Sequence, residues 1–302
     1  MRAPKAIAVY AVAVIPLGAL FAPSAFWELQ IIGNLVQSEW LVTQPFRRVV
    51  DRSVLIVALI GLWTLLRVLG VRHWAELGFA CRRDWLRQVA LGGVLGFGSF
   101  LVAGAVSIAV GTRSLDLNKP VVETISRLLK FLATGVVVAI IEETFFRGGI
   151  QGALQRSMRL APALIVTSAV YSALHFLKPS GVVIEADQVR WYSGFDCLAQ
   201  IISRSLLAPG VAVGFVTLFL AGWILGWAFA KTGALYLSMG LHAGWVFTLK
   251  SYSFFTNANM SETGRWLGAG ALTENVATWP VLAALFGLVA WLCRHEPRPS
   301  QP

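Results

Sequence analysis

The chain has 302 residues, of which 57% are hydrophobic and only 13% are charged, and its mean hydropathy is +0.69. Soluble domains carry about a quarter charged residues, so this composition excludes an ordinary soluble domain and indicates a protein embedded in lipid. The net charge of +10 does not indicate a nucleic-acid partner, because the basic residues form short clusters between apolar stretches, as expected for loops that face anionic lipid.

A membrane-spanning helix needs about 20 mainly apolar residues, and eight segments meet or approach that length. They predict an all-α fold, a polytopic bundle of about eight transmembrane helices without a soluble domain. Between the fifth and sixth segments, residues 195–206 show helical spacing of apolar side chains, which predicts a helix lying in the membrane interface. The eight segments are residues 6–26, 53–70, 86–110, 128–146, 161–177, 206–230, 234–255 and 277–293.

Eight spans place both termini on one side of the membrane, and the excess of basic residues on that side predicts that it is cytoplasmic. The opposite loops also hold Arg47, Arg48 and Arg52, so the excess is modest. The first segment could instead be a cleaved signal peptide, which would leave seven helices in the same orientation. The basic residues on the side of the termini are Arg2, Lys5, Arg72, Arg82, Arg83, Arg87, Arg156, Arg159, Lys231, Arg294 and Arg298.

Ionisable side chains are rare inside the predicted spans. Each costs about 2.5 to 3.5 kcal/mol on insertion scales, so each requires an explanation. Glu142, Glu143 and Arg147 lie together in the fourth segment, His175 lies near the end of the fifth, and His242 lies inside the seventh. These five residues are the candidates for chemistry.

The two adjacent glutamates differ in their predicted partners. On a helix with 3.6 residues per turn, Glu143 and Arg147 stack at i, i+4 with the acid on the N-terminal side, which favours an ion pair. Glu142 points about 100° away and has no cation at its own i+4 position. A carboxylate in apolar surroundings without a cation partner accepts a proton readily, so Glu142 is the candidate general base.

The two histidines suit the remaining tasks of amide hydrolysis. One imidazole can help Glu142 hold and deprotonate a water, and the other can donate a hydrogen bond to the developing oxyanion. Two small-xxx-small pairs, Gly148 with Gly152 and Gly240 with Gly244, predict close approach of the helices that carry these groups. A purely structural role is the alternative, because intramembrane histidines and Glu–Arg pairs also join helices without chemistry.

Three runs in this chain resemble the three motifs of the CPBP family: Glu142-Glu143-xxx-Arg147, an aromatic-xxx-His ending at His175, and Gly-Leu-His-Ala-Gly-Trp around His242. That family contains the type II CAAX prenyl endopeptidases and the bacteriocin-processing and self-immunity proteins labelled Abi. The resemblance implies an intramembrane glutamic protease. In it, Glu142 and His175 would activate the water, His242 would stabilise the oxyanion, and Glu143 with Arg147 would orient the site.

Two positions depart from the family pattern. The family usually has Phe where Tyr171 stands, and it commonly has Asn four residues after the third-motif histidine, where this chain has Val246. Valine cannot donate a hydrogen bond, so part of the oxyanion hole is in question. The resemblance covers residues 128–255, which predicts a protease core there, N-terminal transmembrane helices and loops in 1–127, and a last loop, transmembrane helix and cytoplasmic tail in 256–302.

The sequence therefore predicts an endopeptidase of the cell membrane that hydrolyses a peptide bond of a membrane-associated protein or peptide. Its expected partners are that substrate and the lipid bilayer; no cofactor, metal or nucleic acid is expected. Two alternatives stay open. Glu142, His175 and His242 could hold a catalytic zinc, although HExxH spacing and an obvious second-shell carboxylate are missing. A non-proteolytic scaffold, immunity factor or transporter is the other alternative, and Val246 favours it.

Overall fold

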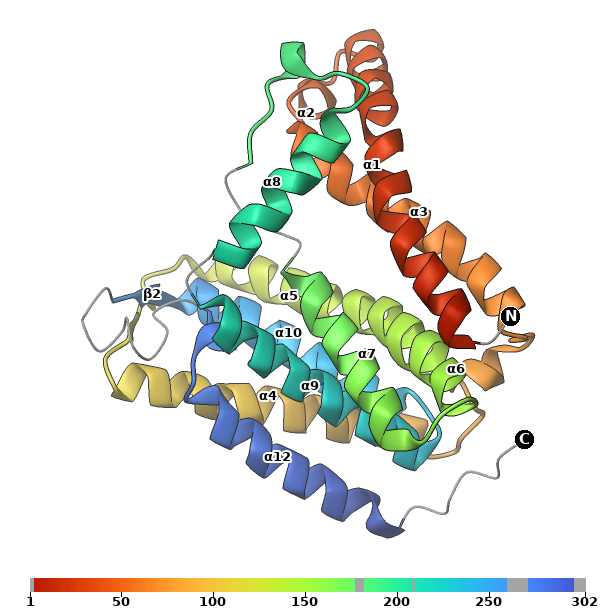
Figure 1. The fold of residues 1–302 in the computed structure, drawn as a ribbon. Coiled ribbons are helices and arrows are strands. Elements are labelled where there is room, and N and C mark those ends of the chain that lie inside the picture. The colour runs from red at the N-terminus through yellow and green to blue at the C-terminus, as the bar shows by residue number, and fades with distance from the viewer. Residues whose placement is uncertain (1–2, 177–181, 208–209, 260–270, 296–302) are drawn as a thin grey trace. The chain divides into compact units, whose positions relative to one another are not determined.

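The computed structural model describes residues 3–176, 182–207, 210–259 and 271–295 (Figure 1). Within these ranges the chain is almost entirely helical, with one short two-stranded antiparallel sheet. The predicted all-α class is confirmed. The chain forms two compact units, which are described separately: Met1–Arg72 with His175–Pro209, and His73–Leu174 with Gly210–Pro302.

The first unit is built on two long helices that pack along each other, α1 and α3, with α8 packed against α1. A side chain at Gly194 of α8 would bring its Cβ within 1.9 Å of the Ala19 carbonyl oxygen, so a glycine is needed for this close approach. The elements are α1 (Ala3–Leu35), α2 (Glu39–Val42), α3 (Phe46–Val68), η3 (Ala186–Gln188) and α8 (Ser193–Leu207).

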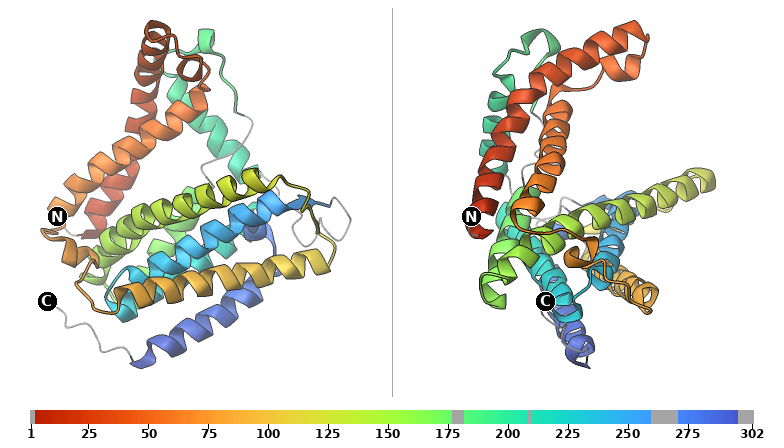
Figure 2. Two further views of the ribbon diagram at one scale, coloured as in Figure 1. Left: turned by 180° about the vertical axis from the view of Figure 1, so that it is seen from behind. Right: turned by 90° about the vertical axis from the view of Figure 1, so that its right-hand side faces the viewer.

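The second unit holds residues 128–174 and 210–255 of the predicted protease core, whereas residues 175–209 belong to the first unit. The α10 helix lies at the centre of the second unit. Figure 2 shows α10 between α4 and α5, and α10 also contacts α9. The elements are η1 (Trp74–Leu77), α4 (Trp85–Ala109), β1 (Arg113–Leu115), α5 (Val121–Glu143), η2 (Thr144–Gln151), α6 (Gly152–Gln155), α7 (Leu160–His175, its last residue in the first unit), α9 (Val211–Thr232), α10 (Tyr236–Phe255), β2 (Thr256–Ala258), η4 (Leu272–Glu274), α12 (Thr278–Leu292) and η5 (Cys293–His295).

Glycines set the contact between α4 and α10. A Cβ at Gly240 would lie 2.2 Å from the Val89 carbonyl oxygen, and one at Gly96 would lie 2.2 Å from the Leu241 carbonyl oxygen. Small residues let helix backbones meet in this way in membranes. The predicted Gly240 and Gly244 pair therefore makes a close helix contact, and its partner is α4.

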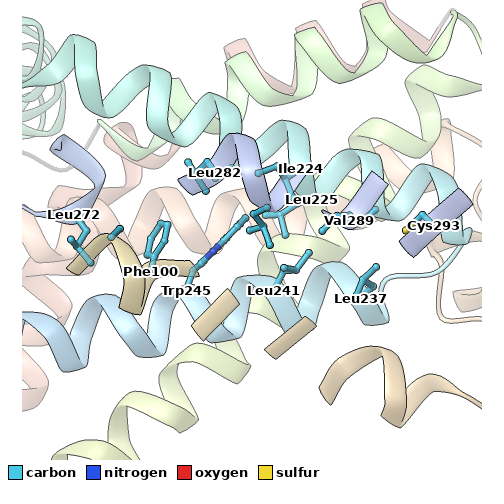
Figure 3. Close-up of a cluster of buried hydrophobic side chains, with 14 residues drawn as sticks. Phe100, Ile224, Leu225, Leu237, Leu241, Trp245, Leu272, Leu282, Val289 and Cys293 are labelled. Carbon is cyan, nitrogen blue, oxygen red and sulfur yellow. The ribbon is translucent and has the colours of Figure 1, made fainter. Parts of the chain in front are cut away.

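An apolar cluster packs around the face of α10 that carries Trp245 (Figure 3). The Trp245 indole stacks on Phe100 of α4, with ring centroids 5.6 Å apart. Leu225 of α9 and Leu282 of α12 complete the cluster. The helix that carries His242 is thus held on several sides by buried side chains, which limits its rotation.

The loop before α4 is tied to the end of α9. Arg82 donates through Nη1 to the Thr232 carbonyl oxygen at 3.0 Å and through Nε to Asp84 Oδ1 at 2.9 Å. The hydrogen bond from Arg82 lowers the pKa of Asp84 to about 2, from an ordinary 3.8. Gln88, buried in the first turn of α4, also donates to this carboxylate.

All eight predicted spans coincide with helices, but some boundaries were wrong. The sixth segment was predicted from Leu206, which belongs to α8; α9 begins at Val211, after Gly210 with a φ of 83°. Leu177, the predicted end of the fifth segment, lies outside the described residues. The α3 helix, which corresponds to the second predicted segment, begins at Phe46, seven residues before the predicted start at Ser53. Its first turns hold an Arg47–Asp51 ion pair.

By length and composition, five helices among the described residues can cross a membrane. They are α1, α3, α4, the continuous run of α5, η2 and α6, and α9; α7 and α12 are shorter apolar helices. The count of about eight spans stays a prediction. Nine of the 20 residues of α10 are buried, and these include the polar residues Ser238, His242 and Thr248.

Candidate active site

A π-helix carries the first motif into the interior of the second unit. The α-helical part of α5 ends at Glu143, and η2 continues the same run in π-helical form from Thr144 to Gln151. Every residue from Phe146 to Gln151 is buried. Such π segments are rare and occur frequently at functional sites, and their periodicity could not be recognised in the sequence.

Glu143 and Arg147 form the predicted ion pair. Arg147 Nη1 lies 3.1 Å from Glu143 Oε1, and both side chains are fully buried. Arg147 also donates through Nη2 to the Gly222 carbonyl oxygen of α9, at 3.2 Å, and its guanidinium carbon lies 4.6 Å from the centroid of the Tyr171 ring. The guanidinium therefore joins η2 to α9 and α7.

Glu143 has a second partner that sequence reasoning missed. His242 Nδ1 lies 2.8 Å from Glu143 Oε1. Because Glu143 is held as a carboxylate by Arg147, it accepts this hydrogen bond and Nδ1 carries the proton. Glu143 thus hydrogen-bonds one ring nitrogen of His242, which overturns the expectation that neither histidine has such a carboxylate partner. The two residues are 99 positions apart, so no local spacing could have indicated the contact.

The two glutamates occupy different environments. Glu143 is fully buried, whereas the side chain of Glu142 is 21% exposed. Glu142 Oε2 lies 3.8 Å from His242 Nε2. The imidazole therefore has one nitrogen on Glu143 and the other turned toward Glu142. Since 3.8 Å is less than twice a usual hydrogen-bond length of about 2.8 Å, one water can contact both of these groups.

The second motif is represented by Tyr171 and His175 on α7. The Tyr171 ring is buried and lies edge-on to His242, with centroids 6.2 Å apart. His175 is the last residue of α7, one helical turn after Tyr171 and on the same face of that helix. The contacts described above bring Glu142, Glu143, Arg147 and His242 together. His175 is placed by its position at the end of α7, one turn after Tyr171.

The groups near the third motif bear on the oxyanion hole. The Trp245 indole donates to Ser99 Oγ at 3.0 Å, so it is committed to α4 and does not replace the missing asparagine. Val246 is half-buried, one turn after His242 on α10. A polar side chain at position 246 would therefore lie on the same face as His242.

We predict that Val246→Asn is tolerated and leaves cleavage unchanged or faster, because it adds a donor on the face of His242. An oxyanion donor is worth about 10²- to 10³-fold in rate where it has been removed elsewhere. The measurement is the cleavage rate beside that of His242→Ala, which we expect to be close to inactive. A folded Val246→Asn protein that loses most activity would show that position 246 serves packing.

Residues 124–248 match the model of the family described as Type II CAAX prenyl endopeptidase Rce1-like. This match confirms the predicted resemblance over that segment. The Rce1-like segment contains all five predicted site residues and Val246. Comparison with curated proteins and with solved structures finds no match. The match to the Rce1-like family model supports a CAAX-type intramembrane protease, and the apolar helices agree with a multi-pass membrane protein.

Proposed function

We propose that this protein is a glutamic intramembrane endopeptidase that hydrolyses a peptide bond of a membrane-associated protein or peptide. The observation that carries the proposal is the placement of His242, bonded to buried Glu143 at 2.8 Å and facing Glu142 at 3.8 Å. The protease core is residues 128–255, flanked by 1–127 and 256–302. The protein lies in the cell membrane with both termini in the cytoplasm.

Glu142 is the general base. A water held between its carboxylate and His242 transfers a proton to Glu142 as the water oxygen attacks the scissile carbonyl carbon. The same proton then passes to the amine of the leaving peptide, so that the base is restored. Glu142 is the more accessible of the two glutamates, with 21% of its side chain exposed against none for Glu143, and its Oε2 atom, which faces His242, is buried.

His242 has a role that depends on its proton. With Nδ1–H committed to Glu143, the Nε2 atom of a neutral ring is an acceptor, and it donates only when the ring is an imidazolium. An imidazolium at His242 would donate to the oxyanion through Nε2 while its Nδ1–H is held by Glu143. Arg147 holds Glu143 in place, and His175 assists Glu142 in activating the water, as the family resemblance implies.

The substrate class is tested by comparing membrane proteomes of cells that carry the wild-type protein with those that carry Glu142→Gln. We expect one or more membrane-anchored proteins to accumulate uncleaved in the variant, with new termini in the wild type only. A C-terminal tripeptide lost from a prenylated cysteine would assign the CAAX reaction. Identical proteomes, together with no cleavage of prenylated or unprenylated peptides in vitro, would support the non-proteolytic alternative.

Chelators are expected to leave activity unchanged, because a base and hydrogen-bond donors suffice for the proposed mechanism. One observation favours the zinc alternative: the Glu143–His242 bond matches the carboxylate support that metal-bound histidines usually have. The measurement is cleavage after prolonged dialysis against a strong chelator, with metal analysis of the active protein. Stoichiometric zinc and loss of activity on its removal would establish a metalloprotease.

A further inference from the structure

A buried glutamine outside the three motifs holds the same helix segment. Gln151, the last residue of η2, is fully buried and donates through Nε2 to the Gly226 carbonyl oxygen at 2.8 Å. Arg147, one turn earlier, donates to the Gly222 carbonyl oxygen. The two side chains thus bond to carbonyls on successive turns of α9, as two parallel ties between η2 and α9.

The glycines of α9 leave the space that these ties need. A Cβ at Gly226 would lie 2.6 Å from Gln151 Oε1, so the amide occupies the position where a side chain would stand. A Cβ at Gly222 would come within 3.2 Å of both Ser168 and Tyr171. The approach of η2 and α7 to α9 therefore depends on both glycines.

The side-chain amide of Gln151 does not satisfy all of its hydrogen-bonding groups. Its Oε1 atom is buried without a hydrogen-bond partner among the described residues, and a buried unsatisfied acceptor is unfavourable. The Gly226 carbonyl lies inside α9, and a carbonyl oxygen has a second lone pair for the side chain beside its intrahelical bond. An apolar side chain of similar shape would avoid the unpaired oxygen. The amide thus makes one buried hydrogen bond and leaves one acceptor unpaired among the described residues.

We propose that Gln151 is a positioning residue of the catalytic centre. A π-helix has poorer intrinsic stability than an α-helix, so the rotation of η2 about its axis needs external ties. Gln151 and Arg147 supply them within η2 itself, and Arg147 passes the orientation to Glu143 and then to His242. This inference rests on the proposed function, because its purpose is to direct Glu142 and His242 toward one water.

The test is Gln151→Leu, with Gln88→Leu as the matched control. Gln88 is also a buried glutamine of the second unit, but its amide donates to Asp84 at the start of α4. With the substrate identified by the proteome comparison, we expect kcat of Gln151→Leu to fall about 10- to 100-fold while KM changes less than about twofold. Gln88→Leu is expected to retain kcat.

A second readout is independent of cleavage. The Nδ1–H signal of His242, identified in histidine-labelled protein by its loss in His242→Ala, reports the bond to Glu143. We expect this signal to shift or broaden in Gln151→Leu and to stay unchanged in Gln88→Leu. If the wild type proves to have no peptidase activity, the proposed function fails while this signal still tests the positioning.

Three outcomes would overturn the inference. One is a folded Gln151→Leu protein with wild-type kcat and an unchanged His242 signal. Another is an equal loss in both glutamine variants, which indicates packing alone. The third outcome concerns folding. If Gln151→Leu does not fold, Gln151→Met takes its place, since methionine adapts to irregular spaces. Failure of both to fold while Gln88→Leu folds would assign Gln151 to packing.

Discussion

The substitution Glu142→Gln is expected to lower hydrolysis by about 10²- to 10⁴-fold or more while the protein stays folded. Glutamine is nearly isosteric with glutamate and removes only the capacity to take the proton of the water. The partly exposed position of Glu142 limits the structural cost of losing its charge. The measurements are the cleavage rate and the thermal unfolding temperature in detergent.

The neighbouring substitution Glu143→Gln is the comparison, and we expect its main effect to be on the stability of the protein. It leaves the buried Arg147 charge without its counterion, and breaking a buried pair costs about 3 to 5 kcal/mol. It also removes the carboxylate that accepts from His242. Yield and unfolding temperature should therefore drop. Wild-type turnover in Glu142→Gln, or a reversal of the two phenotypes, would contradict the assigned roles.

The second large effect is expected at Gly96 on α4. Gly96→Ala would place its Cβ 2.2 Å from the Leu241 carbonyl oxygen, so α4 and α10 must separate. We expect a loss of about 3 kcal/mol or more in unfolding free energy, the upper part of the range for overpacking, because the obstacle is backbone. Activity should fall as well, since His242 directly follows Leu241.

Gly98→Ala provides the control on the same helix. A Cβ at Gly98 meets nothing within 4 Å, so this substitution gains helix propensity of up to about 1 kcal/mol without a clash. Thermal unfolding and cleavage of the two variants should be measured side by side. Similar unfolding temperatures for both would show that the contact between α4 and α10 can relax, and that it does not position His242.

The parts of the site that lie within one helix could be predicted from the sequence. The Glu143–Arg147 pair follows from i, i+4 spacing, and the 100° offset of Glu142 indicates that it points away from Arg147. The family could also be recognised, because its motifs are short runs of fixed spacing. Such features depend on local geometry alone.

Features that depend on contacts between distant segments could not be predicted. The glycine pairs are an example: Gly240 meets α4, whereas Gly148 meets the Leu77 carbonyl oxygen in η1, and neither joins α5 to α10. That contact is made by Gly135, whose Cβ would lie 2.8 Å from the Ala243 carbonyl oxygen. Small residues indicate that a helix is approached closely, but they do not indicate by which neighbour.

The burial of α10 has a consequence for biogenesis. The α10 helix has 20 residues, yet it is not among the five described helices that are both long and apolar enough to cross a membrane. A nascent helix with a histidine near its middle partitions poorly into lipid on its own. The α9 helix is strongly apolar and joins α10 through a tight turn at Gly233, with a φ of 65°. We therefore expect α9 and α10 to leave the translocon as one hairpin, with α4 already in the membrane to receive the glycine face of α10. His242 would then enter the bilayer late in synthesis, after Glu142 and Glu143 of α5.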